Sequence, residues 1–215
     1  DWGDGGHPQP LAVSWPLLAA GAALAWNVKT LDESKLAAGL SRDVYEDSGQ
    51  IAKAALKLGR AHQKLGLNAI NETPLGTVIA APKPADRELF CRNGLKWFAK
   101  IPAAKIKATW REIERQRKVL ARAKPKSSSG KILAQELDLA ARMAGQSCHF
   151  MLWQQAVAAN KTAEAKRLAR TGIRALQRLD KDFNAYWPLR NKATTKHCSP
   201  FLRWRMADYR RGAWD

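Results

Sequence analysis

Residues 162–188 read TAEAKRLARTGIRALQRLDKDFNAYWP, and this segment decides the class of fold. Apolar or small side chains recur in it at steps of three and four residues, the spacing of one helix face. The members of this stripe are Ala165, Leu168, Gly172, Leu176, Leu179, Phe183 and Trp187. Thr162 can cap the start and Pro188 ends the pattern, so the segment predicts one long amphipathic helix.

Helical patterns also fill most of the sequence on either side. The spacing predicts helices over about residues 32–45, 48–66, 86–100, 103–124, 131–160 and 200–211. Residues 68–84, which contain Asn71, Pro74, Gly76, Pro82 and Pro84, predict an irregular connection, and residues 124–130 predict a loop. Two or three long antiparallel helices, joined by that loop, form the predicted structural centre of a mainly α, bundle-like region.

The stretch from Leu17 to Trp26 is apolar and rich in Ala. Its length does not distinguish a packed helix from a segment that ends in a short buried strand. It is much shorter than the about 20 apolar residues of a membrane-spanning helix. Asp1 and Asp4 precede it, where a signal peptide would carry basic residues. We therefore expect no membrane segment; the compartment stays open, with the cytoplasm slightly favoured.

The charge balance is strongly basic, with a formal net charge of +18. The excess is greatest between Arg92 and Lys126, where twelve Lys or Arg face only Glu112 and Glu114. Such a field attracts phosphates and other polyanions. One interpretation is a surface for nucleic acid or another polyanion; the other is a solvated outer face with no such ligand.

The three cysteines, Cys91, Cys148 and Cys198, form no C-x-x-C motif, so they predict neither a zinc module nor a disulfide scaffold. Cys148 and His149 are neighbours, but adjacent residues on a helix point about 100° apart and do not share one ion easily. We expect buried, inert thiols and no metal or other cofactor. A Cys148–Cys198 bridge requires an oxidising compartment.

The first residues, DWGDGGHP, combine two acids, a Trp and a His on a Gly-rich loop, and Trp26-Asn27 follows. Asp1, Asp4 and His7 are candidates for binding sugar hydroxyls, for acid–base chemistry or for metal ligation. The Gly residues permit close approach of a ligand, while Trp2 and Trp26 supply flat apolar faces. The alternative is a structured turn capped by Asp, with both Trp side chains in the core.

Several motifs resemble glycoside hydrolase family 20, the bacterial β-N-acetylhexosaminidases. The opening DWGDGGHPQP, Ser14-x-Pro16, Gly21-Ala22-Ala23 and Trp26-Asn27 are similar to the last part of that family's catalytic barrel. The later similarity, to its helical C-terminal region, lies in LGRAH, LNAINETPL and Phe183-x-x-x-Trp187-x-x-Arg190-Asn191. The resemblance covers most of the chain, and its opening motif is the most specific part.

The resemblance implies a (β/α)₈ barrel that removes terminal N-acetylhexosamine by a substrate-assisted mechanism, an exception to the two-carboxylate scheme. It implies that Trp2, Asp4, His7 and Trp26 bind substrate, with Asp4 accepting a hydrogen bond from a sugar hydroxyl and Trp26 forming a wall of the acetamido pocket. Many members carry a Glu two residues after the late Trp, whereas Val28 stands there in this chain.

The family's catalytic Asp-Glu pair lies on an earlier barrel strand, so the resemblance places it before Asp1. The acidic pairs of this chain, Asp32-Glu33 and Glu46-Asp47, lie in helical or turn contexts and are expected to cap helices or face solvent. We therefore expect no catalytic residue here and no glycoside hydrolysis by the chain alone.

The sequence thus predicts a C-terminal fragment of a glycoside hydrolase. Residues 1–29 would be a remnant of the barrel's last unit, and residues 30–215 a helical region that supports it. Its expected partners are an N-acetylhexosaminide, bound through the parent barrel, and the missing N-terminal part of that barrel. The alternative is a basic helical module that binds nucleic acid or another polyanion.

Overall fold

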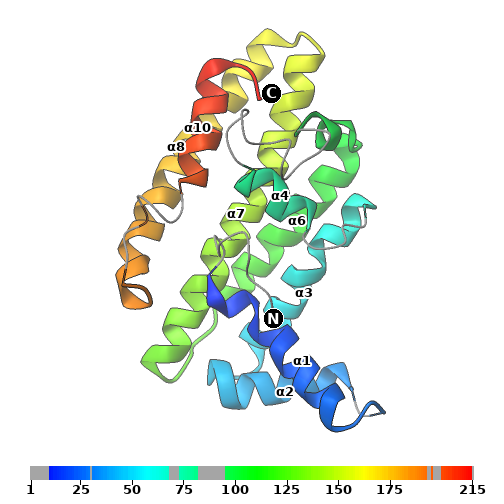
Figure 1. The fold of residues 1–215 in the computed structure, drawn as a ribbon, viewed down its shortest axis with the longest axis vertical. Helices are drawn as coiled ribbons and strands as arrows, with labels where there is room; N and C mark the ends of the chain where they lie inside the picture. The colour runs from blue at the N-terminus through cyan, green and yellow to red at the C-terminus, as the bar shows by residue number, and fades with distance from the viewer. Residues whose placement is uncertain are drawn as a thin grey trace. The chain divides into compact units, whose positions relative to one another are not determined.

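The computed structural model describes residues 10–29, 31–67, 73–81, 95–192, 195 and 200–214. These residues are mainly helical and include no β-strand, which confirms a mainly α fold (Figure 1). The remnant of a barrel expected at residues 1–29 is not shown. Residues Trp15–Trp26 form a helix, and this decides between the helix and the strand for that segment. No helix within the described ranges is long and apolar enough to cross a membrane.

The chain divides into two compact units. Unit 1 comprises the described residues of Asp1–Ala61 and Arg111–Ala141, and unit 2 those of His62–Trp110 and Arg142–Asp215. Two long helices, α6 (Ala103–Leu120) and α7 (Ser128–Ala158), contribute residues to both units. The loop expected at residues 124–130 lies earlier, at residues 121–127, because α6 ends at Leu120 and α7 begins at Ser128.

Unit 1 contains short helices packed on the neighbouring parts of α6 and α7. They are η1 (Leu11–Val13), α1 (Trp15–Trp26), α2 (Glu33–Leu40), the π-helical η2 (Ser41–Tyr45) and α3 (Gln50–Arg60). Their buried side chains, among them Leu40 and Ile51, form a core with Leu133 and Leu137 of α7. Removing these apolar surfaces from water is the main stabilising term of such a unit.

In each of the two acidic pairs the Asp caps a helix, as the sequence predicts. The Asp32 carboxylate accepts hydrogen bonds from the backbone N–H groups of Ser34, at 2.7 Å, and Lys35, at 3.1 Å. Hydrogen bonds from the Ser34 hydroxyl and from these two N–H groups lower the pKa of Asp32. Asp47 accepts from Gln50 and Ile51 at the start of α3. Both carboxylates serve helix ends rather than a reaction.

Unit 2 contains the other helices and the remaining parts of α6 and α7. They are α4 (Pro74–Ala80), η5 (Leu95–Lys100), α8 (Thr162–Tyr186), η6 (Trp187–Leu189) and α10 (Phe201–Arg211). The helix η3 (Ala61–Leu65) also belongs to unit 2, except for its first residue. Figure 1 shows α10 lying along α8. The close approach occurs at Gly172, where an added Cβ would lie 2.5 Å from the Tyr209 ring.

The expectation of an irregular connection over residues 68–84 is wrong for α4. Thr73 caps this helix through its hydroxyl, which accepts from the Gly76 N–H at 3.1 Å. Pro74 occupies the first helical position, where its missing N–H costs no hydrogen bond. The residue types that suggested a break instead begin a helix.

Candidate functional site

Of the four residues predicted to bind substrate, the structure places only Trp26. Trp2, Asp4 and His7 lie outside the described residues. Trp26 is the last residue of α1, and its exposed fraction is 93%. The side chain is thus neither in the core nor on a strand; its indole is open to solvent at the end of a helix.

Trp26 belongs to a larger apolar surface, which we name the α1 surface. Apart from Leu189, every exposed large apolar side chain of the described residues lies in it: Leu11, Leu17, Leu18, Leu24, Trp26, Val28 and Leu31. Leu17 is 77% exposed and Val28 is 78% exposed. No charged residue occurs between Leu11 and Val28. Large apolar side chains gathered in the exposed positions of one segment are typical of a place where another surface binds.

The short helix η1, directly before α1, is fixed to unit 1 by buried polar contacts. The Glu136 carboxylate on α7 accepts a hydrogen bond from the Ala12 N–H at 2.8 Å, and the Tyr45 hydroxyl donates to the Ala12 carbonyl at 3.3 Å. All three residues are fully buried. Burial, and next the charges of Glu136 and Asp47, raise the pKa of Tyr45, so its hydroxyl stays protonated and remains a donor. The anchored start holds α1 in place although most of its side chains face solvent.

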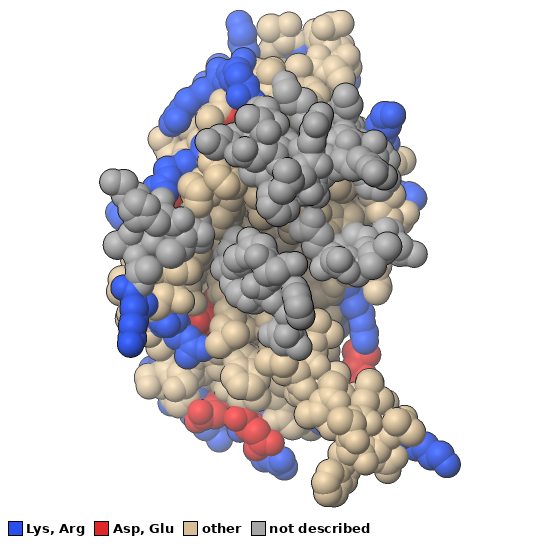
Figure 2. Space-filling model, viewed as in Figure 1, with Lys and Arg blue, Asp and Glu red and all other residues tan. Residues whose placement is uncertain are grey.

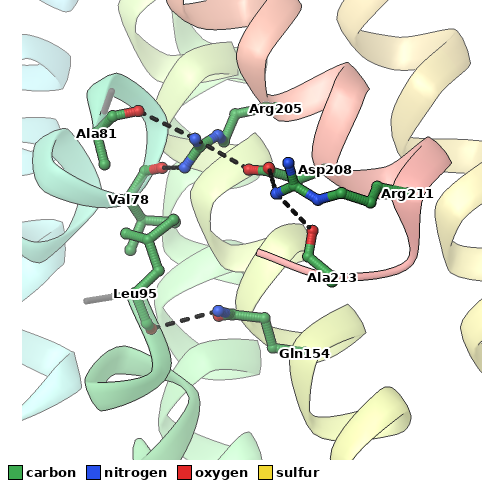
Figure 3. A network of polar contacts seen from close by, with 8 residues as sticks. All are labelled: Val78, Ala81, Leu95, Gln154, Arg205, Asp208, Arg211 and Ala213. Atoms are coloured by element: carbon green, nitrogen blue, oxygen red, sulfur yellow. Dashed lines mark hydrogen bonds and ion pairs between the residues drawn. The ribbon is translucent and has the colours of Figure 1, made fainter. Parts of the chain in front are cut away.

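A buried polar network in unit 2 has a structural role (Figure 3). The Arg205 guanidinium donates to the carbonyls of Val78, at 3.1 Å, and Ala81, at 3.0 Å, at the end of α4. It also pairs with Asp208 at 3.0 Å, and Asp208 accepts from Arg211 at 2.7 Å. Orphan carbonyls at a helix end are thereby satisfied by a cation, which also complements the helix dipole.

This network corrects one interpretation of the last helix. From the sequence we expect α10 to turn its aromatic face inward and its Arg residues outward. Tyr209 is indeed buried, against Phe150 and Trp153, with ring centroids 5.3 and 4.8 Å away. Arg205, however, is also buried, because its charge is matched by Asp208 and by carbonyls of α4.

His149 and Cys148 also lie in the core of unit 2. His149 Nδ1 shares a hydrogen bond of 2.8 Å with the Tyr209 hydroxyl, and its ring meets Trp110 edge to face. Burial, and next the charge of Arg167, lower the pKa of His149 to about 4. Burial raises the pKa of the Cys148 thiol to about 12, so it stays protonated and unreactive. Within the described part of the chain, no group of His, Cys, Asp and Glu side chains could hold a metal ion.

A second exposed surface, which the sequence did not lead us to single out, follows the outer face of α8. We name it the α8 cation row; its members are Lys166, Arg167, Arg170, Arg174, Arg178 and Lys181. All six side chains are exposed. The signal that could have found them is the four-residue step that joins Lys166, Arg170, Arg174 and Arg178 on one face of the predicted helix.

The comparisons with known proteins give no relative: no protein-family model, no curated protein and no solved structure matches this chain.

Proposed function

We propose that this chain is the C-terminal part of a glycoside hydrolase of the family 20 type, which removes terminal N-acetylhexosamine. In this proposal residues 1–29 complete the catalytic barrel and the helices from residue 30 onward support it. The single observation that carries the proposal is that the segment resembling the barrel coincides with the α1 surface, which is apolar, uncharged and open to solvent.

The α1 surface is stabilised when another apolar surface covers it. Burying the exposed leucines, valine and indole is favourable, by roughly 25 cal/mol for each Å² of apolar surface removed from water. No charge within Leu11–Val28 has to be desolvated when another surface covers α1. The rest of the barrel, on the proposal, is that surface. Trp26 then reaches the sugar subsite only in the assembled barrel, beside Trp2, Asp4 and His7.

The chemistry assigned to this chain is recognition. In the family that the chain resembles, one Glu protonates the leaving oxygen and a neighbouring Asp orients the acetamido group, whose oxygen attacks the anomeric carbon. Asp32 and Asp47 do not replace that pair, because their carboxylates accept hydrogen bonds from helix N-termini. The part of the parent before Asp1 supplies the acid chemistry, and this chain supplies an indole and polar contacts.

The test is to read the coding DNA upstream of Asp1 and to express the joined product. We expect in-frame barrel strands with an adjacent Asp-Glu, nitrophenol release from a nitrophenyl N-acetyl-β-glucosaminide by the joined product, and none by this chain alone. Trp26→Ala in the joined product should raise KM at least tenfold. Hydrolysis by the chain alone, or an upstream sequence without a barrel, would overturn the proposal.

A further inference from the structure

We propose that the α8 cation row binds the phosphate backbone of double-stranded nucleic acid, independently of its sequence. This site goes beyond the proposed glycosidase function and does not depend on it, because it lies on α8 in unit 2. Figure 2 shows Lys and Arg side chains gathered along the edge of the molecule where Figure 1 places α8 and α10.

The cations of the row are available to an external anion. Two of the three acids on α8 pair with other cations: Glu164 with Lys161 at 3.9 Å, and Asp182 with Arg142 at 2.7 Å, while the third, Asp180, forms no ion pair with the row. Among the described residues no acidic side chain lies within ion-pair distance of any member of the row. Within this part of the chain, the positive charge of the row is therefore left to solvent ions.

The backbone of α8 orders these charges into a line. From Lys166 to Lys181 the helix rises by about 22 Å, at about 1.5 Å for each residue. At about 100° for each residue, the six side chains occupy an arc of about 120°. The opposite face is buried and holds Leu168, Leu176 and Phe183. Because that face packs in unit 2, the helix cannot rotate, and the row is held in one direction before any ligand arrives.

A duplex fits this line better than other anionic partners. It carries about one negative charge for each 1.7 Å of axis, so about a dozen phosphates lie along 22 Å. It is also straight and stiff over this length. Four of the six cations are Arg, whose planar guanidinium can hold two phosphate oxygens at once.

The other residues of the arc argue against two alternatives. Ala163, Gln177, Asn184 and Ala185 lie in the same arc, and this arc of α8, a helix described over its whole length, contains no aromatic side chain. A single strand would lack the stacking platform that such proteins use. For binding to a membrane surface, the arc lacks the large apolar side chains that insert below the headgroups. The chemistry that remains is contact with regularly spaced phosphates.

The test is the salt dependence of binding to a labelled 20-base-pair DNA duplex, measured by fluorescence anisotropy. Six phosphate contacts predict a slope of log K against log salt of about −5, from 0.9 × 6. The test variant is Arg170→Gln/Arg174→Gln/Arg178→Gln. The matched control is Lys35→Gln/Lys64→Gln/Lys131→Gln, which removes the same charge from exposed positions on three different helices.

The row variant should halve the slope, since three contacts remain. At 0.1 M salt each contact contributes roughly eightfold (10 to the power 0.9), so affinity should fall roughly 500-fold. The control should change affinity less than threefold. Circular dichroism checks that both variants keep the helix content of the original chain.

Three results would overturn the proposal. The first is an equal loss of affinity in the row variant and the control, which would mean diffuse attraction by the net charge. The second is no duplex binding at 50 mM salt. The third is tight binding to a sulfated polysaccharide without duplex binding, which would assign the row to a different polyanion. None of these results bears on glycoside hydrolysis, so the two proposals fail separately.

Discussion

Replacing Arg205 with Met tests whether a buried cation joins α10 to α4 within unit 2. The side chains of Arg205 and Asp208 are only 1% and 2% exposed, and they pair at 3.0 Å. Arg205 also donates to the Val78 and Ala81 carbonyls at the end of α4 (Figure 3). Met has a similar apolar stem, so the substitution removes the charge and its hydrogen bonds while it keeps much of the packing.

The expected loss in the free energy of unfolding is about 3–5 kcal/mol. This is the usual cost of removing one partner of a buried ion pair, because the other charge stays buried with less compensation. The loss of the two bonds to carbonyls is part of this figure and is not added to it. Arg210→Met is the matched control: Arg210 is exposed on the same helix, and its substitution should cost less than about 0.5 kcal/mol.

Urea unfolding, followed by circular dichroism, measures both variants under the same conditions. A double variant, Arg205→Met/Asp208→Leu, adds a test of the cause. Removing both charges should destabilise the protein less than the sum of the two single substitutions. The reasoning is refuted if Arg205→Met and Arg210→Met differ by less than about 1 kcal/mol, or if the double variant equals the sum.

Three further predictions concern other contacts. Because burial lowers the pKa of His149 to about 4, the folded state binds fewer protons at acidic pH than the unfolded state. The free energy of unfolding should therefore fall by up to about 3 kcal/mol as the pH drops from 6.5 to 4. Unfolding of a His149→Gln variant should lack this pH dependence. Gly172→Ala brings a Cβ to 2.5 Å from the Tyr209 ring and should lower stability by about 1–2 kcal/mol in a thermal melt, despite the better helix propensity of Ala; an unchanged melting temperature would contradict this contact. The α1 surface should make the isolated chain self-associate, and Leu17→Ser/Val28→Ser should shift sedimentation toward the monomer; equal sedimentation of both proteins would remove this surface from the explanation.

Local sequence chemistry accounts for most of the helices. The stripe that contains Leu168, Leu176 and Phe183 predicts α8, and these residues are buried in unit 2. Asp32 predicts the start of α2 and accepts its first N–H groups. Both predictions succeed because their causes, helical periodicity and capping, act within a few residues of the chain.

Other features depend on distant partners and could not be predicted. The burial of Arg205 requires carbonyls of Val78 and Ala81, more than 120 positions earlier. The exposure of Trp26 depends on what covers α1, which an apolar pattern does not reveal. Its sequence pattern also fits a buried strand or a packed helix. The remaining sugar-site residues, Trp2, Asp4 and His7, stay predictions from the resemblance.

The α8 cation row shows why a count of charges along the sequence does not by itself locate a phosphate site. The greatest excess of Lys and Arg is at residues 92–126, but ion pairs within the described part of that segment reduce it: Arg115 meets Glu112 at 2.5 Å, and Arg117 meets Asp138 on α7 at 2.8 Å. On α8 three acids lower the count, yet Glu164 and Asp182 pair elsewhere. The charge that a phosphate backbone meets depends on which cations share a face and lack a partner. That quantity follows from the helix and its ion pairs, so the salt slope of the row variant against its control is the measurement that can distinguish a built site from net charge.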